Sequence, residues 1–120
     1  GVSLSNSGPL SSGNPHPRNY GSYTEVLSKY VRDKKVLNLE EAVRKMTSLP
    51  AQKFNLKNRG LIDKNKVADL LIFDLDQIKS ATFSKPDFYP EGISAVIVNG
   101  KTAVLDGAYQ NVKAGKLILN

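Results

Sequence analysis

The side chains best suited to chemistry lie in the first 20 residues of the chain. Asn6 ends a short strand-like segment, and a loop rich in Gly, Ser and Pro then carries Arg18 and the one histidine of the sequence, His16. Enzymes commonly present catalytic side chains on such loops. An amide, however, cannot take a proton from water at ordinary pH and gives a metal no negative charge. Because Gly1–Thr24 holds no Asp or Glu, the sequence predicts a site without its base.

Length and composition restrict the class of protein. A chain of 120 residues is long enough for one domain with a modest core. It contains no cysteine, so a disulfide framework is excluded and a reducing compartment is expected. No apolar run approaches the roughly 20 residues that cross a bilayer, and the first residues lack the pattern of a signal peptide. We therefore expect a soluble, cytoplasmic protein without a membrane partner.

Positive charge is concentrated in one stretch of the sequence. The net charge is +6, and Lys29–Lys66 holds eleven Lys or Arg against four acids. A basic surface attracts nucleic acid or acidic lipid. Nucleic-acid-binding segments, however, interleave aromatics or arginines with their lysines, whereas these lysines gather at expected turns and element ends. The pattern favours a solvated face and no nucleic-acid partner.

Two helical regions follow the loop. Ser22 and Glu25 have the spacing of a capping box, and the apolar residues after them predict a helix over Tyr23–Lys34. Asn38 is the expected N-cap of a second helix over Leu39–Leu49. A short third helix, capped by Ser48 and with Pro50 in its opening turn, is expected to run towards Phe54.

From Leu61 the pattern changes to strands. The apolar run in Ala68–Asp74 predicts a strand buried on both faces. Ser94–Leu105 predicts a β-hairpin, because Asn99-Gly100 supplies the two positive-φ positions of a type I′ turn. A last strand is expected over Lys116–Leu119.

An aromatic segment separates these strands. Ala81–Gly92 contains Pro86 and Pro90, which exclude a regular helix or a central strand. We expect an ordered loop whose rings pack against the sheet or the helices, and a substrate lid is the alternative. Its rings are Phe83, Phe88 and Tyr89.

Several segments together resemble the C-terminal part of the D-aminoacylases, the N-acyl-D-amino-acid deacylases of the metal-dependent amidohydrolase superfamily. The Ala68–Asp74 strand and the Asn99-Gly100 hairpin recur across that superfamily and are weakly specific. More specific are Pro-His-Pro-Arg-Asn-Tyr-Gly at 15–21, Met-Thr-Ser-Leu-Pro-Ala at 46–51, Ala-Thr-Phe at 81–83 and Pro-Glu-Gly-Ile at 90–93. The resemblance covers nearly the whole chain.

The resemblance implies an α/β parent enzyme with a (β/α)₈ barrel and a small β-sandwich. Residues 1–60 would form the C-terminal end of the barrel, with Gly1–Asn6 as its last strand and two to three helices outside. Residues 61–120 would supply antiparallel strands of the sandwich. The chain is then a fragment; a processed terminus or tag remnant before a disordered arm is the other interpretation. As a fragment, it is expected to self-associate through exposed apolar helix faces.

The resemblance also implies a chemistry for position 6. In the family, zinc-bound hydroxide attacks the amide carbon of an N-acyl-D-amino acid, and an aspartate at this position is the general base. Asn6 departs from that pattern, as in a catalytically dead homologue, an engineered variant or an enzyme with another base. A catalytic zinc needs about three protein ligands, and one histidine without cysteine cannot supply them. We expect zinc in the parent enzyme, none bound by this chain alone, and no turnover by the isolated chain.

Two residues are candidates for substrate binding. A free substrate carboxylate suits a planar bidentate donor, and Arg18, with His16, could reach it from the loop. Alternatively, both side chains brace the proline-rich turn through loop carbonyls. Tyr20 is expected to be a packing residue. Beside the hydrolase hypothesis stands a non-enzymatic α+β scaffold or interaction module, with the basic stretch as its contact surface.

Overall fold

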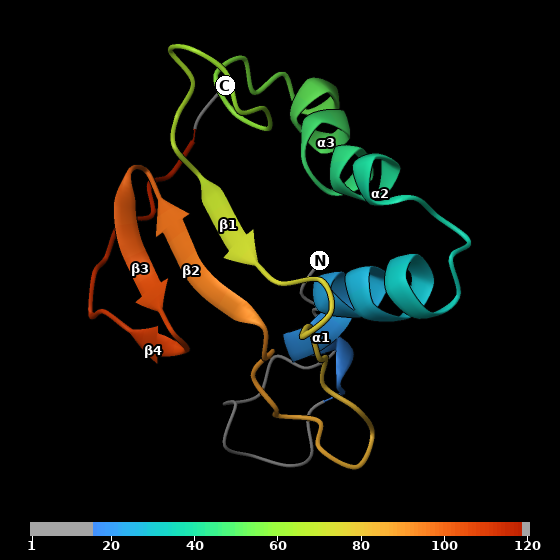
Figure 1. Ribbon diagram of the computed structural model, residues 1–120. Helices are drawn as coiled ribbons and strands as arrows, with labels where there is room; N and C mark the ends of the chain where they lie inside the picture. Colours follow the sequence, from blue (N-terminus) through green and yellow to red (C-terminus); the bar gives the residue numbers. More distant parts are fainter. Residues whose placement is uncertain (1–15, 119–120) are drawn as a thin grey trace.

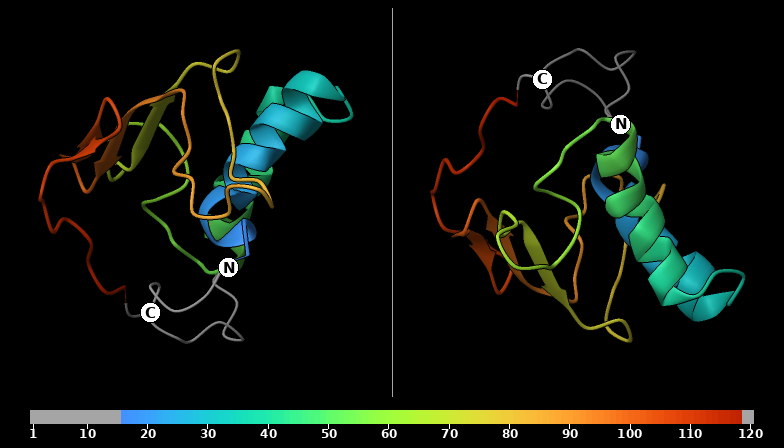
Figure 2. Two further views of the ribbon diagram at one scale, coloured as in Figure 1. Left: turned by 90° about the horizontal axis from the view of Figure 1, so that it is seen from below. Right: turned by 90° about the horizontal axis from the view of Figure 1, so that it is seen from above.

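The computed structural model describes residues 16–118 of the chain. Four helical segments come first, and a four-stranded antiparallel sheet follows (Figure 1). In Figure 2 the helices lie over one another and the sheet stands beside them. The expected strand Gly1–Asn6 and the candidate residue Asn6 lie outside the described residues.

The first helix begins earlier than predicted. Helix α1 (Arg18–Glu25) follows Pro17, whose φ of −55° and ψ of −26° are already helical. A proline at this point fixes φ and has no N–H that would need a partner. Ser22 lies inside the helix, and its hydroxyl donates to the Arg18 carbonyl at 2.7 Å. The predicted capping box is therefore wrong, and the predicted loop ends at Pro17.

A π-helix continues this element. Segment η2 (Val26–Asp33) follows α1 without a break and buries Leu27 and Val31. The predicted helix end at Lys34 agrees with the structure to within one residue.

The second helical region divides in two. In α2 (Leu39–Met46), the Asn38 side chain accepts the Glu41 N–H at 2.8 Å, so the predicted N-cap is confirmed. Thr47 breaks the helix with φ −128° and ψ −81°. Pro50 causes this break, because a proline ring clashes with the carbonyl four residues earlier. The third helix, α3 (Ser48–Lys53), forms as expected, but Ser48 is its first residue and not its cap.

The sheet has the order β1-β2-β3-β4, with every pair antiparallel. Its strands are β1 (Leu70–Phe73), β2 (Ile93–Val98), β3 (Lys101–Leu105) and β4 (Ala108–Tyr109). The predicted hairpin is confirmed, since Asn99 and Gly100 join β2 to β3 with φ of 49° and 76°. A second turn of the same kind at Asp106-Gly107, with φ of 48° and 78°, adds β4, which the sequence analysis missed.

The strand predicted in Ala68–Asp74 is confirmed as β1, but its predicted burial on both faces is wrong, and so is the strand predicted from Lys116 on. Within the described residues nothing covers both faces of β1, and Leu71 and Ile72 are 44% and 52% exposed. The residues 116–118 are irregular. Strand propensity needs a ladder partner, and these residues pair with none of the described strands.

The loop that follows β1 is ordered, as predicted. Between Ala81 and Gly92 it contains neither a helix nor a sheet strand, and isolated bridges join Lys79 to Glu91 and Thr82 to Lys85.

The apolar core is small. Of its eight buried apolar residues in the described range, five are alanines. Helices contact helices and strands contact strands, so the two parts are joined mainly through loops. No helix within residues 16–118 has the length and apolar character needed to cross a membrane.

Candidate functional site

The described part of the candidate site is the segment His16–Gly21, which enters α1. The His16 Nδ1 accepts the backbone N–H of Arg18 at 3.2 Å. The His16 ring also meets Phe83 of the aromatic loop in a T-shaped contact, with ring centroids 5.1 Å apart. This edge-to-face arrangement is one that aromatic pairs prefer. The imidazole therefore contacts both the helix start and the aromatic loop.

Arg18 is the first residue of α1 and is exposed. Its backbone N–H donates to His16, and its carbonyl accepts from Ser22. Within residues 16–118 its guanidinium has neither a hydrogen bond nor an ion pair. An unpaired, exposed guanidinium can hold a carboxylate through two parallel hydrogen bonds.

Tyr20 packs on the same loop. Its ring lies edge-on to Tyr89, with centroids 5.5 Å apart. The aromatic loop is thus packed against α1, one of the two arrangements that the sequence allowed. In Figure 1 this loop (gold) passes below α1 (blue).

Gly21 is a position whose importance the sequence analysis missed. The Ser80 hydroxyl donates to the Gly21 carbonyl at 2.8 Å. A Cβ at Gly21 would lie 2.2 Å from Ser80 Oγ and 2.8 Å from the backbone nitrogen of Ala81. Only glycine allows the loop to approach the helix so closely. The glycine itself is the available signal, because the local pattern predicts a loop at this position.

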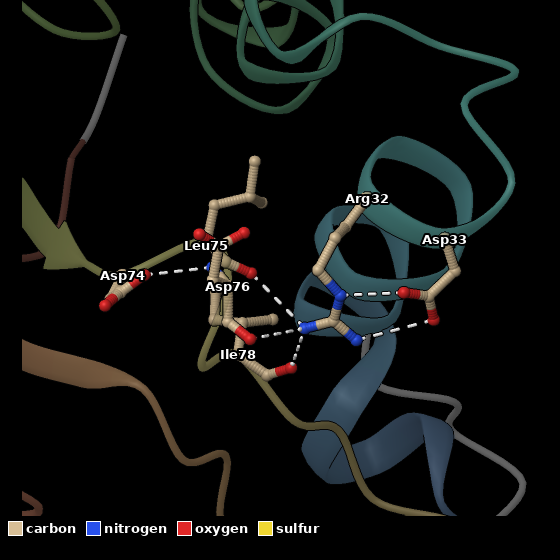
Figure 3. Close-up of polar contacts among 6 residues, drawn as sticks. All are labelled: Arg32, Asp33, Asp74, Leu75, Asp76 and Ile78. Atoms are coloured by element: carbon tan, nitrogen blue, oxygen red, sulfur yellow. Dashed lines mark hydrogen bonds and ion pairs between the residues drawn. The ribbon is translucent and has the colours of Figure 1, made fainter.

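Arg32 is a second missed residue (Figure 3). Its Nη1 donates to the carbonyls of Leu75, Asp76 and Ile78 at 3.3, 3.3 and 2.7 Å. Its Nε lies 2.7 Å from the Asp33 carboxylate, and this hydrogen bond holds the pKa of Asp33 below its ordinary value. Arg32 therefore joins η2 to the segment after β1 and is not part of the solvated basic face that the charge pattern predicts.

Other charges of the basic stretch are paired locally. Hydrogen bonds from Arg44, with Lys45 also close, lower the pKa of Glu41 to about 2. Lys29 contacts Glu25 at 2.9 Å, and this hydrogen bond raises the pKa of Lys29. Exposed pairs of this kind are typical of a solvated helix face.

An open hollow of about 640 Å³ lies between the aromatic loop and the Asp106-Gly107 turn. Neither His16 nor Arg18 lines it. Tyr89, which lines the hollow, contacts Tyr20, so the hollow adjoins the candidate segment without including His16 or Arg18.

Comparison with known proteins decides the family. The model of the family described as "Amidohydrolase family" matches residues 2–104. The chain belongs to the amidohydrolase family. It is 43% identical to the N-acyl-D-glutamate deacylase of Alcaligenes xylosoxydans xylosoxydans over 87% of this chain and 21% of the relative.

Solved amidohydrolases share the fold. A D-aminoacylase crystal structure has 41% identity and a TM-score of 0.82, over 85% of this chain and 22% of that chain. The N-acyl-D-glutamate deacylase of Bordetella bronchiseptica, solved with zinc and a phosphonate mimic of the tetrahedral intermediate, has 42% identity and a TM-score of 0.73. That match covers 75% of this chain and 19% of the other. The present chain spans about a fifth of the length of the relatives it matches.

The residues described here contain no group of ligands for a zinc ion like the one in the Bordetella deacylase structure. In the range 16–118, no three or more His, Cys, Asp or Glu side chains are grouped so that they could hold a metal ion. The whole sequence has one histidine and no cysteine, whereas a catalytic zinc takes about three protein ligands. The residues in the range 16–118 do not fit a zinc centre.

Proposed function

We propose that this chain is the C-terminal segment of an amidohydrolase that hydrolyses the amide bond of N-acyl-D-amino acids to a carboxylate and a D-amino acid. The similarity to an N-acyl-D-glutamate deacylase over 87% of the chain, at 43% identity, carries the proposal. Any zinc ligands of the complete enzyme would come from residues outside this chain.

Residues 1–60 would complete a (β/α)₈ barrel, and residues 61–120 would form part of a β-sandwich. The small core supports a segment of a larger fold, because large apolar side chains stay exposed in both parts. Tyr23 on α1 is 62% exposed, and Ile72 on β1 is 52% exposed. In a complete enzyme, such surfaces would face the rest of the barrel and sandwich.

Asn6 would occupy the position of the catalytic aspartate of the family. An amide there cannot act as a general base, and general acid–base catalysis contributes about 10²–10⁴-fold to a rate. Arg18 would hold the substrate carboxylate, since its guanidinium is exposed and has no partner within residues 16–118. His16 would support Arg18 through the bond to its backbone N–H.

A hybrid deacylase tests this proposal. In it, the present chain replaces the matching part of the Alcaligenes N-acyl-D-glutamate deacylase, and release of D-glutamate is measured with zinc present. We expect slow turnover with Asn6 and an increase in kcat of about 10²–10⁴-fold in the Asn6→Asp form. Asn65→Asp, at an exposed turn, is the matched control and should leave kcat unchanged. A folded, zinc-loaded Asn6→Asp hybrid without turnover would contradict the proposed function.

Arg18 has its own test in the same hybrid. Arg18→Ala should raise KM by about tenfold or more while kcat changes less, because a charge-assisted bidentate contact is lost. The KM of Arg18→Lys should lie between the KM of the unaltered hybrid and that of Arg18→Ala. An unchanged KM in Arg18→Ala would remove the carboxylate-binding role.

The isolated chain should self-associate through its exposed apolar surface. Helical residues of this surface include Tyr23 on α1 and Val43 on α2. Sedimentation velocity should show mass increasing with concentration for the chain alone, and Val43→Lys, on α2, should reduce the effect. A monomer at all concentrations would exclude this contact.

A further inference from the structure

The segment Lys79–Glu91 is a closed loop between β1 and β2. The Lys79 N–H donates to the Glu91 carbonyl at 3.3 Å, and the Lys79 Nζ lies 2.7 Å from the Glu91 carboxylate. Gly92 follows with φ +79°, and a Cβ there would lie 2.6 Å from the Gln77 carbonyl carbon. Only glycine fits this closure. Surface loops whose ends meet in this way are frequently functional.

The start of the loop is anchored from η2. The Arg32 guanidinium holds the carbonyls that precede Lys79, with its shortest bond, 2.7 Å, to Ile78 (Figure 3). Ile78 is itself fully buried. The backbone from which the closed loop begins is therefore held in place.

From this backbone the loop reaches back to the start of α1. Ser80 bonds the Gly21 carbonyl, Phe83 meets His16, and Tyr89 meets Tyr20. These contacts are distributed from the first to the last residue of the His16–Gly21 segment. Both ends of the segment are thus held by one loop.

The two ring contacts do little to bury surface. Phe83 and Tyr89 remain 81% and 77% exposed. Their pairs with His16 and Tyr20 are both edge-to-face, with interplanar angles of 77° and 85°. Such contacts are directional. Their main effect is therefore to fix the orientation of the rings on the helix start.

We propose that the closed loop Lys79–Glu91 positions the His16–Gly21 segment, with Phe83 and Tyr89 as positioning residues for Arg18. The loop acts through His16, whose Nδ1 holds the Arg18 backbone N–H, and through Tyr20 on the first turn of α1. This inference rests on the proposed function, because Arg18 is there the group that binds the substrate carboxylate. No role in the chemical step is assigned to the loop.

The contact itself can be tested without enzyme activity. His16 is the only histidine, so labelling histidine at ring Cε1 gives the 120-residue chain one imidazole C–H signal in an NMR spectrum. Phe83→Leu removes the neighbouring ring and should move that signal toward the position of a histidine in an unfolded peptide. Tyr23→Leu, an exposed ring on α1 outside both pairs, is the matched control. An unmoved signal in a folded Phe83→Leu chain would overturn the proposal, whatever the enzyme does.

The consequence for binding is tested in the hybrid deacylase with Asn6→Asp. Tyr89→Leu should raise KM for N-acetyl-D-glutamate about three- to tenfold, the equivalent of one aromatic pair, with kcat within about twofold. Tyr89→Phe keeps the ring and should restore KM, whereas a loss caused only by lowered stability would reduce active enzyme without changing KM. Tyr23→Leu again serves as the control.

The outcomes separate the two proposals. If the hybrid shows no deacylase activity, the proposed function fails, and the positioning of Arg18 for substrate fails with it, although the His16 signal still reports the loop contact. If the hybrid is active and the His16 signal responds, but KM is the same in Tyr89→Leu as in the control, the loop does not position Arg18. A KM increase that Tyr89→Phe reverses supports the inference.

Discussion

The Arg59 guanidinium donates to Asn99 Oδ1 at 2.6 Å, which ties the segment before β1 to the turn of the central hairpin. The same guanidinium forms an ion pair with Asp69, and the Asp69 carboxylate accepts the Asn99 N–H at 2.8 Å. Asn99 Nδ2 then donates to the Ala114 carbonyl at 2.6 Å. The Asn99 side chain therefore joins the hairpin turn to the segments around Arg59 and Ala114.

Replacement of Arg59 should destabilise this junction. The side chain is only 17% exposed, and Arg59→Met leaves the Asn99 and Asp69 oxygens without their charged donor, which costs about 1–3 kcal/mol of unfolding free energy. Urea unfolding measures the loss. Lys29→Met, which breaks an exposed pair, should leave the unfolding free energy nearly unchanged. Equal effects in the two variants would contradict this ranking.

The same substitution should expose Asn99 to deamidation. In that reaction the Gly100 nitrogen attacks Asn99 Cγ, ammonia leaves, and water opens the cyclic imide. Here the Gly100 N–H donates to the Ala68 carbonyl at 2.8 Å, and both ends of the Asn99 amide are hydrogen-bonded. Peptide mass spectrometry should show faster conversion of Asn99 to acid in Arg59→Met than in the unaltered chain. Equal rates would show that these bonds do not protect the turn.

Gly21→Ala should destabilise the protein, although alanine is normally the better helix residue. The new methyl carbon would meet Ser80 and Ala81 at distances that require movement of the backbone, and forced overpacking typically costs about 1–3 kcal/mol. Thermal unfolding measures the effect. Gly115→Ala is the matched control, since no atom lies within 4 Å of its Cβ position. A stabilised Gly21→Ala chain would show that the loop moves away freely.

Arg32→Lys should loosen the loop while it keeps the charge. An ammonium is a compact donor and cannot hold the Asp33 carboxylate and the carbonyls of 75–78 in the planar geometry of a guanidinium. Limited proteolysis should therefore cleave the region 75–92 faster in Arg32→Lys than in the unaltered chain. Arg44→Lys, on the exposed face of α2, should not change the cleavage rate. Equal cleavage in the two variants would contradict the anchoring role.

Glu41 gives the folded state a predictable pH dependence. Its pKa is lowered from 4.5 to about 2 by the Arg44 hydrogen bond, so the folded state favours the ionised carboxylate. The stabilisation is present above pH 4.5 and is lost as pH falls from there to about 2. Thermal unfolding midpoints across this window should fall less steeply in Glu41→Gln. Added salt should reduce the difference, because the pair is exposed.

Local signals in the sequence were sufficient for the caps and turns. The N-cap of Asn38 and the backbone conformation of the Asn99-Gly100 turn depend on residues within three positions, so local spacing predicts the helix start and the hairpin. Asp106-Gly107 carried the same kind of signal, and β4 was missed only because Ala108-Tyr109 is too short to stand out as a strand.

Long-range contacts were beyond such patterns. Nothing near Arg32 in the sequence shows that its partners lie 43–46 positions away. The start of α1 was missed for a related reason, since the Pro17 and Gly21 that suggested a loop are accommodated in the helix, Gly21 by its contact with Ser80. Asn6, the central candidate of the sequence, lies outside the described residues, so its role stays a prediction.

The bonds between Lys79 and Glu91 make the position of the loop ends independent of the residues between them. Because the two ends are bonded to each other, changes in the length or sequence of the loop should leave the register of β1 on β2 unshifted. Such changes would instead alter the contacts that the loop makes with the start of α1. The closed loop is therefore where evolution, or a protein engineer, could retune the neighbourhood of Arg18 while leaving the β-scaffold intact.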